Sequence, residues 1–488
     1  MARYDLLIRN ASLYDGSGAP PRQGDLAVSG DRIAAIGDLS GATADREIDA
    51  RGRALAPGFI DAHTHDDNAI LCGPDCMECK LSQGVTSVVI GNCGLSLAPA
   101  RMTRRPPAPL DLVGDESVWA FDSFAAYADR LRRQPPPVNA YALIGHMSLR
   151  VEAMNHDVDR PATDREAARM KQRLTEALKE GGSGFSTGLW YPPSRHAPTD
   201  EVIAVAEALR DHGGLYVTHM RDEGDGVIDS IEETLKIGRD TGSAVVISHH
   251  KCMMPQNFGR SAETLARIDE AAKTQTVDFD VYPYPAGSTA LMVDRVHASL
   301  PIQISSSEPH PEMAGRMLND IAAEWGVDVA AAAQRLLPAS AIYFFMDEGD
   351  VRRILAHPRS MVGSDGIPSN DMPHPRLWGT FPRVLGHYAR DLGLITLAQA
   401  VHKMTGLTAK VFGMVDRGIL REGAWADLVL FDPDSVIDTA TYAAPKTPAR
   451  GIDEVWVNGV SSYVGGKAGG KQGVTGAAAG RLIRRNEA

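Results

Sequence analysis

Cysteine and long apolar runs are scarce in this sequence. The 488 residues include only 5 cysteines, an odd and small number that argues against a disulfide framework and is typical of a reducing compartment. No stretch of about 18 or more apolar residues occurs, so the sequence predicts no membrane-spanning helix. The first residues, MARYDLLIRNASLYDG, lack a charged segment followed by an apolar one, so no signal peptide is predicted. We expect a cytoplasmic, soluble protein.

Positive charge is also in short supply. Lysine and arginine number 50 against 62 aspartates and glutamates, which gives a net charge of -12. This deficit argues against nucleic acid or an anionic membrane surface as a partner. A small anionic substrate would need a locally basic pocket. Nothing in the sequence pattern indicates an oligomeric state.

The two ends of the chain have a texture that differs from the middle. Residues 1–56 and 415–488 consist of short strand-like runs with turn residues between them, such as GDLAVSGDRIAAIGDL and GIDEVWVNGVSSYVGG. We therefore expect both ends to build one small β-sandwich domain.

Residues 57–414 alternate strand-like apolar runs with helix-period segments such as DREAARMKQRLTEALKEG, the pattern of a parallel α/β sheet. The eight candidate strands are LAPGFIDAHTH, GVTSVVIGNCG, NAYALIGHM, GSGFSTGLWY, GLYVTHMRDE, SAVVISHHK, VDFDVYPY and RSMVGSDG. Eight such units predict a (β/α)8 TIM-like barrel, in which catalytic side chains follow the carboxyl ends of the strands. The long connection at 285–345 is predicted to fold over the barrel mouth as a lid.

A His-x-His pair ends the first predicted strand, in ALAPGFIDAHTHDDN (residues 54–68). Residues two apart on a strand point to the same side, so His63 and His65 can aim two imidazoles at one metal ion. The alternative is a surface strand with two unrelated histidines.

Other metal-binding side chains end other predicted strands. Cys93 follows the second strand, His219 the fifth, His249 the sixth and Asp365 the eighth. Thiolate, imidazole and carboxylate together are a set of ligands suited to zinc. The alternative is a group of core histidines with an incidental buried cysteine. Because His249 and His250 are adjacent, they should point to opposite faces, and we assign His249 to the metal.

These residues resemble the pattern of the amidohydrolase superfamily, and within it the sequence is similar to the D-aminoacylases (N-acyl-D-amino-acid deacylases). The similarity covers residues 55–410 and extends into the β-rich ends. The matching motifs are GFIDAHTHDDN, SQGVTSVVIGNCGLSLAP, THMRDEG, VVISHHK, NFGRS, YPYPAGST, IYFFMDE, GSDGIPS, HPRLWGTFPRVLG and MTGLTA. Many dinuclear members carry a carboxylated lysine on strand four, but GSGFSTGLWY has no lysine. The resemblance implies that the Cys93 thiolate supplies the missing negative charge.

The resemblance also implies two metal positions. Cys93, His219 and His249 would hold a tightly bound zinc, and His63, His65 and Asp365 would form a weaker second position. Zinc lowers the pKa of a bound water and polarises the amide carbonyl. Asp365 would then act as general base toward that water and return the proton to the leaving amine. The alternative for Asp365 is a carboxylate that only caps a turn.

The substrate-binding residues are expected from the same resemblance. Lys251 and Arg295 would bind the α-carboxylate of the substrate, with hydrogen bonds from Tyr282 and Ser288. The alternative is that these are solvated surface charges with a loop tyrosine and serine. The pocket for the amino-acid side chain would be formed by Trp190, Tyr191, His297, Tyr343 and Met346. Because all but His297 are large and apolar or aromatic, we expect hydrophobic D-amino acids as substrates.

Several other features of the sequence give weaker evidence of function. Cys72, Cys76 and Cys79 have metal-like spacing, but no second cysteine pair or nearby histidine completes a site. We expect Arg221, Asp222 and Glu223 to brace the loop after strand five, and His146 is left open between packing and substrate contact. Two other functions are weighed: a cyclic-amide hydrolase of the hydantoinase or dihydroorotase kind, and a non-catalytic scaffold. All six predicted metal positions carry competent side chains, which a scaffold would be expected to have lost.

Overall fold

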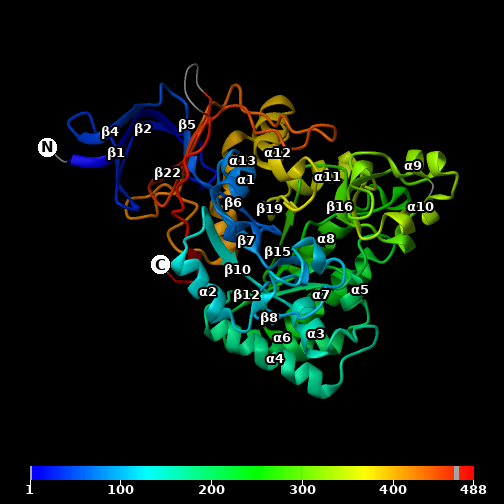
Figure 1. Ribbon diagram of the computed structural model, residues 1–488. Helices are drawn as coiled ribbons and strands as arrows, with labels where there is room; N and C mark the ends of the chain where they lie inside the picture. The colour runs from blue at the N-terminus through cyan, green and yellow to red at the C-terminus, as the bar shows by residue number, and fades with distance from the viewer. Residues whose placement is uncertain (1–2, 298, 467–471, 488) are drawn as a thin grey trace.

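The computed structural model describes residues 3–297, 299–466 and 472–487. It has a β-rich unit built from both ends of the chain, which lies beside a barrel built from the middle (Figure 1). An insertion that carries α9 and α10 projects from the barrel on the side away from the β-rich unit (Figure 1). In the described ranges, no helix has the length and apolarity needed to cross a bilayer.

Strands from both ends of the chain form one nine-stranded sheet, which agrees with the predicted β-sandwich domain. Its order is β23-β22-β21-β20-β5-β1-β2-β3, with β4 beside β1. Strand β5 joins the two ends, because it pairs in parallel with β1 and antiparallel with β20. The strands are β1 (Arg3–Leu13), β2 (Arg22–Ser29), β3 (Arg32–Gly37), β4 (Thr43–Asp49), β5 (Ala54–Pro57), β20 (Leu428–Phe431), β21 (Ile452–Val457), β22 (Val460–Val464) and β23 (Gly473–Val474).

The middle of the chain forms the predicted (β/α)8 barrel. Its parallel strands are β6 (Phe59–Asp61), β7 (Val85–Ile90), β10 (Asn139–Ala142) with its continuation β11 (Ile144–Gly145), β12 (Gly184–Gly188), β13 (Leu215–His219), β14 (Ala244–Ile247), β15 (Val277–Val281) and β19 (Ser360–Val362). The third strand is interrupted at Leu143, so that β10 pairs with β7 and β11 pairs with β12. The backbone N–H of Ala62 donates to Val362 O at 3.2 Å, and a parallel bridge joins Thr64 to Gly366. These contacts between the first and eighth strands close the barrel.

Helices cover the outside of the barrel. In α4, for example, Thr163 and Glu166 form a capping box that fixes the start of the helix. The apolar face that packs on the barrel consists of Met170, Leu174, Ala177 and Leu178. The helices are α1 (Glu78–Leu81), α2 (Phe124–Arg133), α3 (His146–Ala153), α4 (Asp164–Lys179), α5 (Pro192–Arg195), α6 (Thr199–Ala206), α7 (Val227–Thr241), α8 (Ser261–Ala271), α11 (Glu348–Ala356), α12 (Arg376–Arg383), α13 (Leu397–Met404) and α14 (Gly406–Phe412).

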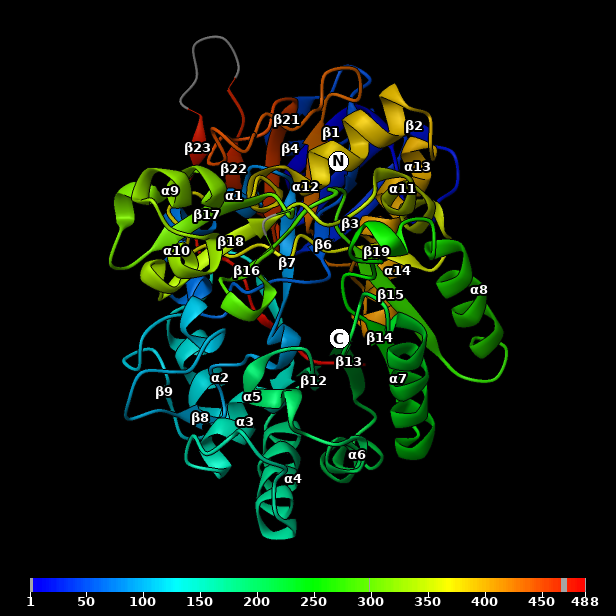
Figure 2. The same cartoon turned by 90° about the vertical axis from the view of Figure 1, so that its right-hand side faces the viewer.

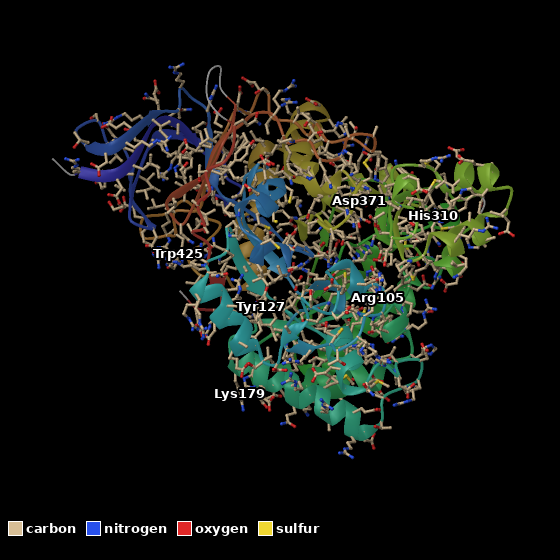
Figure 3. All side chains as sticks on the ribbon, in the orientation of Figure 1. Arg105, Tyr127, Lys179, His310, Asp371 and Trp425 are labelled. Atoms are coloured by element: carbon tan, nitrogen blue, oxygen red, sulfur yellow. The ribbon has the colours of Figure 1, made fainter. Side chains whose placement is uncertain are left out.

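The end of the chain contributes to both units. Beyond the β-rich unit, β24 (Leu482–Ile483) pairs in parallel with β10, and Ile483 is buried in the barrel interior with Tyr141 and Leu215. Trp425 lies at the same junction (Figure 3), where its ring packs against the guanidinium groups of Arg32, Arg417 and Arg481 at 3.6, 4.4 and 4.7 Å.

The connection at 285–345 folds as a small α/β unit of its own, of which residue 298 lies outside the described residues. Strands β16 (Gly287–Ala290), β18 (Ala339–Tyr343) and β17 (Ile302–Ser307) form an antiparallel sheet in that order, covered by α9 (Leu318–Trp325) and α10 (Val329–Leu336). Strand β16 reaches the barrel, because Thr289 Oγ1 donates to Tyr191 Oη at 3.1 Å. Figure 2 shows this unit at one side of the barrel mouth.

Candidate metal centre and active site

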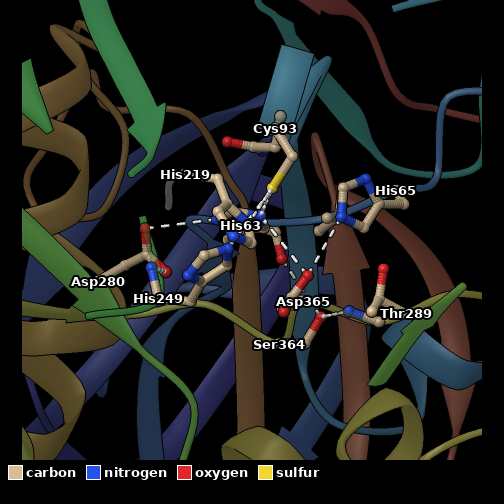
Figure 4. A network of polar contacts seen from close by, with 12 residues as sticks. His63, His65, Cys93, His219, His249, Asp280, Thr289, Ser364 and Asp365 are labelled. Carbon is tan, nitrogen blue, oxygen red and sulfur yellow. Dashed lines mark hydrogen bonds and ion pairs between the residues drawn. The ribbon is translucent and has the colours of Figure 1, made fainter. Parts of the chain in front are cut away.

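The thiol of Cys93 is the centre of a buried cluster of imidazoles (Figure 4). Its Sγ lies 3.2 Å from His63 Nε2, 3.5 Å from His249 Nε2 and 3.8 Å from His219 Nδ1. Two groups of three ligands share this thiol: His63, His65 and Cys93, and Cys93, His219 and His249. Within each group, the potential ligand atoms lie within 4.8 Å of one another. A thiol with several imidazoles in this arrangement fits zinc.

Three residues of the cluster have left-handed backbone conformations. The φ angles are 53° at Cys93, 36° at His249 and 49° at Asp365, where residues other than glycine are uncommon. Each such conformation costs about 1–3 kcal/mol and persists only where the surrounding structure imposes it. The fold therefore holds these side chains at one point at the expense of backbone strain.

Strand four lacks a side chain where the Cys93 loop crosses it. A Cβ added to Gly188, at the end of β12, would lie 2.2 Å from Cys93 O. The sequence has no lysine on strand four, and the structure shows why a bulkier residue than Gly188 would not fit there. The Cys93 loop occupies the space at the end of this strand.

A single carboxylate supports both imidazoles of the group formed by Cys93, His219 and His249. Glu223 Oε1 lies 3.1 Å from His249 Nδ1, and Oε2 lies 3.5 Å from His219 Nε2. Glu223 also accepts a 2.7 Å hydrogen bond from Lys251 Nζ. A carboxylate behind a metal-bound histidine fixes the orientation and tautomer of the ring. Glu223, which was expected only to brace a loop, is thus in direct contact with two predicted ligands.

The second histidine of strand six points away from the cluster. His250 Nε2 lies 2.8 Å from Thr264 Oγ1, and its ring packs against Phe279. His249 faces Cys93 instead.

Asp280 is a further carboxylate beside the cluster, and its role was not predicted from the sequence. Its Oδ2 lies 3.5 Å from His63 Nδ1, and its Oδ1 accepts a hydrogen bond from His249 N at 2.9 Å. Asp280 lies on β15, two residues after Asp278 and therefore on the same face of the strand. The signal in the sequence was the position of this carboxylate near the end of a barrel strand.

Asp365 faces the cluster from the end of β19. Its Oδ1 lies 3.1 Å from His65 Nε2 and 3.6 Å from His63 Nε2. Its Oδ2 forms an ion pair with Arg376 Nη2 at 2.9 Å. Burial would raise the pKa of Asp365, but Arg376 and the neighbouring histidines outweigh burial and hold this pKa well below its ordinary value. Asp365 is therefore a carboxylate at neutral pH.

The cluster also ionises the thiol. Burial would raise the pKa of Cys93, but the imidazoles of His63 and His249 hold it well below its ordinary value. For His65, burial would lower the pKa, while hydrogen bonds with Asp365 and Cys93 raise it to about 9. The pKa of His219 is lowered by burial. A thiolate and a neutral imidazole at His219 are the forms that bind a metal ion.

Three cavities lie in a row beside this cluster. The central cavity, of about 30 Å³, is lined by Lys251, Tyr282, Ser288, Trp190 and Tyr191, among others. Of the residues predicted to hold a substrate carboxylate, only Arg295 does not line it. Arg295 is half exposed, stacks on Trp190 at 5.0 Å and lines an outer cavity of about 290 Å³.

The predicted side-chain pocket corresponds mainly to the outer cavity. Trp190, His297 and Tyr343 line it, while Tyr191 lines the central cavity. Met346 lines none of the three cavities. Its Sδ accepts a 3.4 Å hydrogen bond from Tyr282 Oη.

Two residues of the site, Phe345 and Arg376, were not predicted from the sequence. Phe345 lines both the central and the outer cavity. Its position two residues after Tyr343 could have predicted this, because alternate residues of an extended chain share a face. Arg376 is buried at 1 % exposure and stacks on Tyr282 at 4.4 Å. It stands in the motif HPRLWGTFPRVLG, but its contact with Asp365 depends on how the chain folds back.

The remaining candidates lie outside this site. His146 is buried, with its Nε2 3.6 Å from Glu201 Oε1, and lines none of the three cavities. In the described part of the chain, the metal-binding groups both contain Cys93, and none includes Cys72, Cys76 or Cys79. These three thiols are free.

Comparison with known proteins identifies the family. The model of the amidohydrolase family matches residues 46–463. A D-aminoacylase from Alcaligenes xylosoxydans xylosoxydans is 52% identical over 99% of this chain and 98% of the relative. This chain belongs to the D-aminoacylase group of the amidohydrolase family.

Members of the D-aminoacylase group differ in their named substrates. An N-acyl-D-aspartate deacylase of the same organism is 50% identical over 96% of this chain and 94% of its own length. The crystal structure of a D-aminoacylase has a TM-score of 0.95 at 51% identity, and covers 99% of this chain and 100% of that one. That of an N-acyl-D-glutamate deacylase from Bordetella bronchiseptica, complexed with zinc and a phosphonate inhibitor, has a TM-score of 0.93 at 47% identity, with coverage of 99% and 100%.

Proposed function

We propose that this protein uses zinc to hydrolyse the amide bond of N-acyl-D-amino acids, releasing a carboxylate and a free D-amino acid, and that it favours hydrophobic side chains. One observation carries the proposal: the Cys93 thiol, the surrounding imidazoles and the Asp365 carboxylate meet beside a cavity lined by a buried lysine. The preference for D-amino acids and for N-acyl amide bonds is inferred from the similarity to the D-aminoacylase and the N-acyl-D-amino-acid deacylases.

Cys93, His219 and His249 would hold the tightly bound zinc, and His63, His65 and Asp365 would form the second, weaker position. Zinc bound there would lower the pKa of a water toward neutrality and polarise the carbonyl of the amide. Glu223 supports the first position by orienting both of its imidazoles.

Asp365 would act as the general base. Its carboxylate is deprotonated, faces the cluster and is held between His65 and Arg376. It would take a proton from the attacking water and deliver it to the leaving amine, because an amine leaves more readily once it is protonated.

The central cavity offers partners for the substrate α-carboxylate. Lys251 brings a buried ammonium, 3% exposed, and the hydroxyls of Tyr282 and Ser288 lie in the same wall. Ser288 Oγ is buried without a hydrogen-bond partner among the described residues, so it is available to a ligand. Arg295 lies at the outer cavity and would act from its rim.

The outer cavity favours apolar side chains. Trp190, Tyr343, Phe345 and Leu300 supply most of its apolar wall. Its charged residues are three aspartates, Asp222, Asp225 and Asp294, against the single guanidinium of Arg295. An acidic D-side chain would therefore meet a surplus of negative charge.

The cyclic-amide hydrolase is the second candidate function considered. The strand β12 argues against this function, because it carries no lysine that could be carboxylated and it ends in Gly188 under the Cys93 loop. The scaffold alternative is opposed by the ionised thiol and the ordered imidazoles.

Hydrolysis of N-acetyl-D-methionine and N-acetyl-L-methionine, with zinc counted in the same sample, tests the proposal. We expect turnover of the D form alone, little turnover of N-acetyl-D-glutamate, and none of a hydantoin or dihydroorotate. His249→Ala should lose zinc and activity, whereas the matched control His250→Ala should keep zinc. No turnover of either methionine derivative by the zinc-loaded protein would contradict the proposal.

A further inference from the structure

The third cavity of the row adjoins the central cavity and shares no lining residue with the outer cavity. Its apolar wall comes from three parts of the chain: the loop after β7, the 3-10 helix η4 (Leu110–Leu112) with the residue on either side of it, and the loop after β19. These residues are Leu95, Pro109, Leu112, Val113 and Ile367. Its volume of about 10 Å³ is roughly the size that holds one water-sized group.

Shared walls fix the order of the three cavities. The smallest and the central cavity share Tyr191, Ser288 and Thr289. The central and the outer cavity share Trp190, Met253 and Phe345. His65 of the metal cluster lines the smallest cavity, and His219 lines the central one. The central cavity therefore has one neighbour on each side, of about 10 and about 290 Å³.

We propose that the smallest cavity is the acyl subsite, and that Leu112 and Val113 limit the acyl group to formyl or acetyl. This inference rests on the proposed function and specifies its substrate further. An N-acyl-amino acid has three groups around the reacting amide: an acyl chain, an α-carboxylate and a side chain. The cation that would bind the carboxylate lies in the central cavity, and only the outer cavity has room for a side chain of methionine size.

The chemistry of the small cavity suits an alkyl group. Its charged or ionisable members are His65, which faces Asp365, and Tyr191, whose hydroxyl accepts from Thr289. Ser288 and Thr289 contribute hydroxyls to the side shared with the central cavity. The rest of the wall is aliphatic, with Leu95 at 3% exposure and Val113 and Ile367 at 5% each. A methyl group placed there loses no hydrogen bond and gains apolar contact.

Two surface contacts connect this wall to neighbouring segments. Ser369 Oγ donates to Leu112 O at 2.5 Å, which ties η4 to the loop after β19. Arg105 Nη1 lies 2.6 Å from Glu308 Oε2, which ties the same loop to the insertion at 285–345. Figure 3 shows Arg105 on the side of the barrel that faces this insertion.

A series of N-formyl-, N-acetyl-, N-propanoyl- and N-butanoyl-D-methionine tests the subsite with the zinc-loaded enzyme. We expect kcat/KM to fall by about tenfold or more for each methylene added beyond acetyl, because an apolar pocket that fits one methyl group discriminates at that level. Val113→Ala and, independently, Leu112→Ala should raise the butanoyl-to-acetyl ratio of kcat/KM by about tenfold or more. Leu300→Ala, in the outer cavity, is the matched control and should leave this ratio within about twofold.

The outcomes separate the subsite from the function on which it rests. An enzyme active on N-acetyl-D-methionine whose rate is indifferent to acyl length would overturn the subsite alone. So would an acyl ratio that responds to Leu300→Ala and to neither loop variant, because the substrate would then lie in the opposite direction. An enzyme inactive on every member of the series would overturn both the function and the subsite.

Discussion

The two groups of ligands that share Cys93 differ in what stands behind them. Behind Cys93, His219 and His249, one carboxylate reaches both imidazoles, since Glu223 contacts His249 Nδ1 and His219 Nε2. Behind His63, His65 and Cys93, Asp280 lies 3.5 Å from His63 Nδ1. Neither His63 Nδ1 nor His65 Nδ1 has a hydrogen-bond partner among the described residues. Outer partners orient metal ligands and raise affinity, so the first group should bind zinc more tightly.

The pKa values of the histidines also favour tighter zinc binding by the first group. Asp365 and Cys93 raise the pKa of His65 to about 9, and the pKa of His63 is raised by Cys93 and Asp280 even though burial opposes it. Both rings must release a proton before they bind a metal ion. In the first group the pKa of His219 is lowered by burial, and only His249 has a raised pKa. The comparison teaches that two sites sharing a thiolate can differ in affinity through the carboxylates around them.

Cys93→Ala is the change with the largest expected effect, because it removes the ligand that both groups share. Zinc content should fall toward zero, and kcat/KM for N-acetyl-D-methionine should fall by roughly 10³-fold or more as water activation and carbonyl polarisation are lost. Cys252→Ala, which removes a buried thiol outside the metal-binding groups, is the control. Full activity with stoichiometric zinc in the Cys93 variant would show that Cys93 is not the ligand shared by the two groups.

Asp365→Asn should be next in size. The amide cannot take a proton from water, so kcat should fall by about 10²–10⁴-fold, while the first zinc remains because Asp365 is not one of its three ligands. Zinc analysis beside single-substrate kinetics measures both quantities. Loss of the first zinc in parallel with activity would assign Asp365 a ligand role there in place of the base.

Glu223→Gln and Asp280→Asn form a matched pair, one behind each group. Glu223→Gln should weaken the first zinc by about 10–100-fold, measured by competition with a chelator. Asp280→Asn should leave that affinity nearly unchanged and weaken the second position instead, because Asn keeps an oxygen for His249 N. Equal effects of the two variants on the first zinc would remove the distinction between the groups.

The pH dependence of the second position should be the smallest effect. Since His65 is protonated below a pKa of about 9 in the metal-free site, metal affinity there should rise with pH up to that value. The rise should be about tenfold per pH unit for each proton released, and steeper than at the first position, where only His249 has a raised pKa. Calorimetric titration of the zinc-loaded protein with a second equivalent, at several pH values, measures it. A pH-independent second affinity would contradict the assignment.

Much of this site could be predicted because barrel geometry orders strand ends. His63, Cys93, His219, His249 and Asp365 were found from their places after separate predicted strands, and the fold brings all five together. The split between His249 and His250 also followed from the alternation of side chains on an extended segment.

The outer partners were harder to predict, because their roles depend on orientation and not on position. Glu223 and Asp280 both sit in ordinary charged turns or strands, and only the folded chain shows that they point at imidazole nitrogens. Arg295 stands near Tyr282 and Ser288 in sequence, yet the chain after β16 carries it outward to the rim. Arg376 reaches Asp365 only because α12 begins against the barrel mouth. The small cavity joins segments separated by more than 200 residues, which no local pattern records.

Stepwise addition of zinc to the metal-free protein, with hydrolysis of N-acetyl-D-methionine followed at each step, tests the central claim most directly. The comparison of the two groups predicts that activity rises to its maximum with the first equivalent and does not rise with the second. The first metal should also be absent from His249→Ala and present in His65→Asn. Activity that appears only with the second equivalent, or that survives in the metal-free protein, would contradict the account.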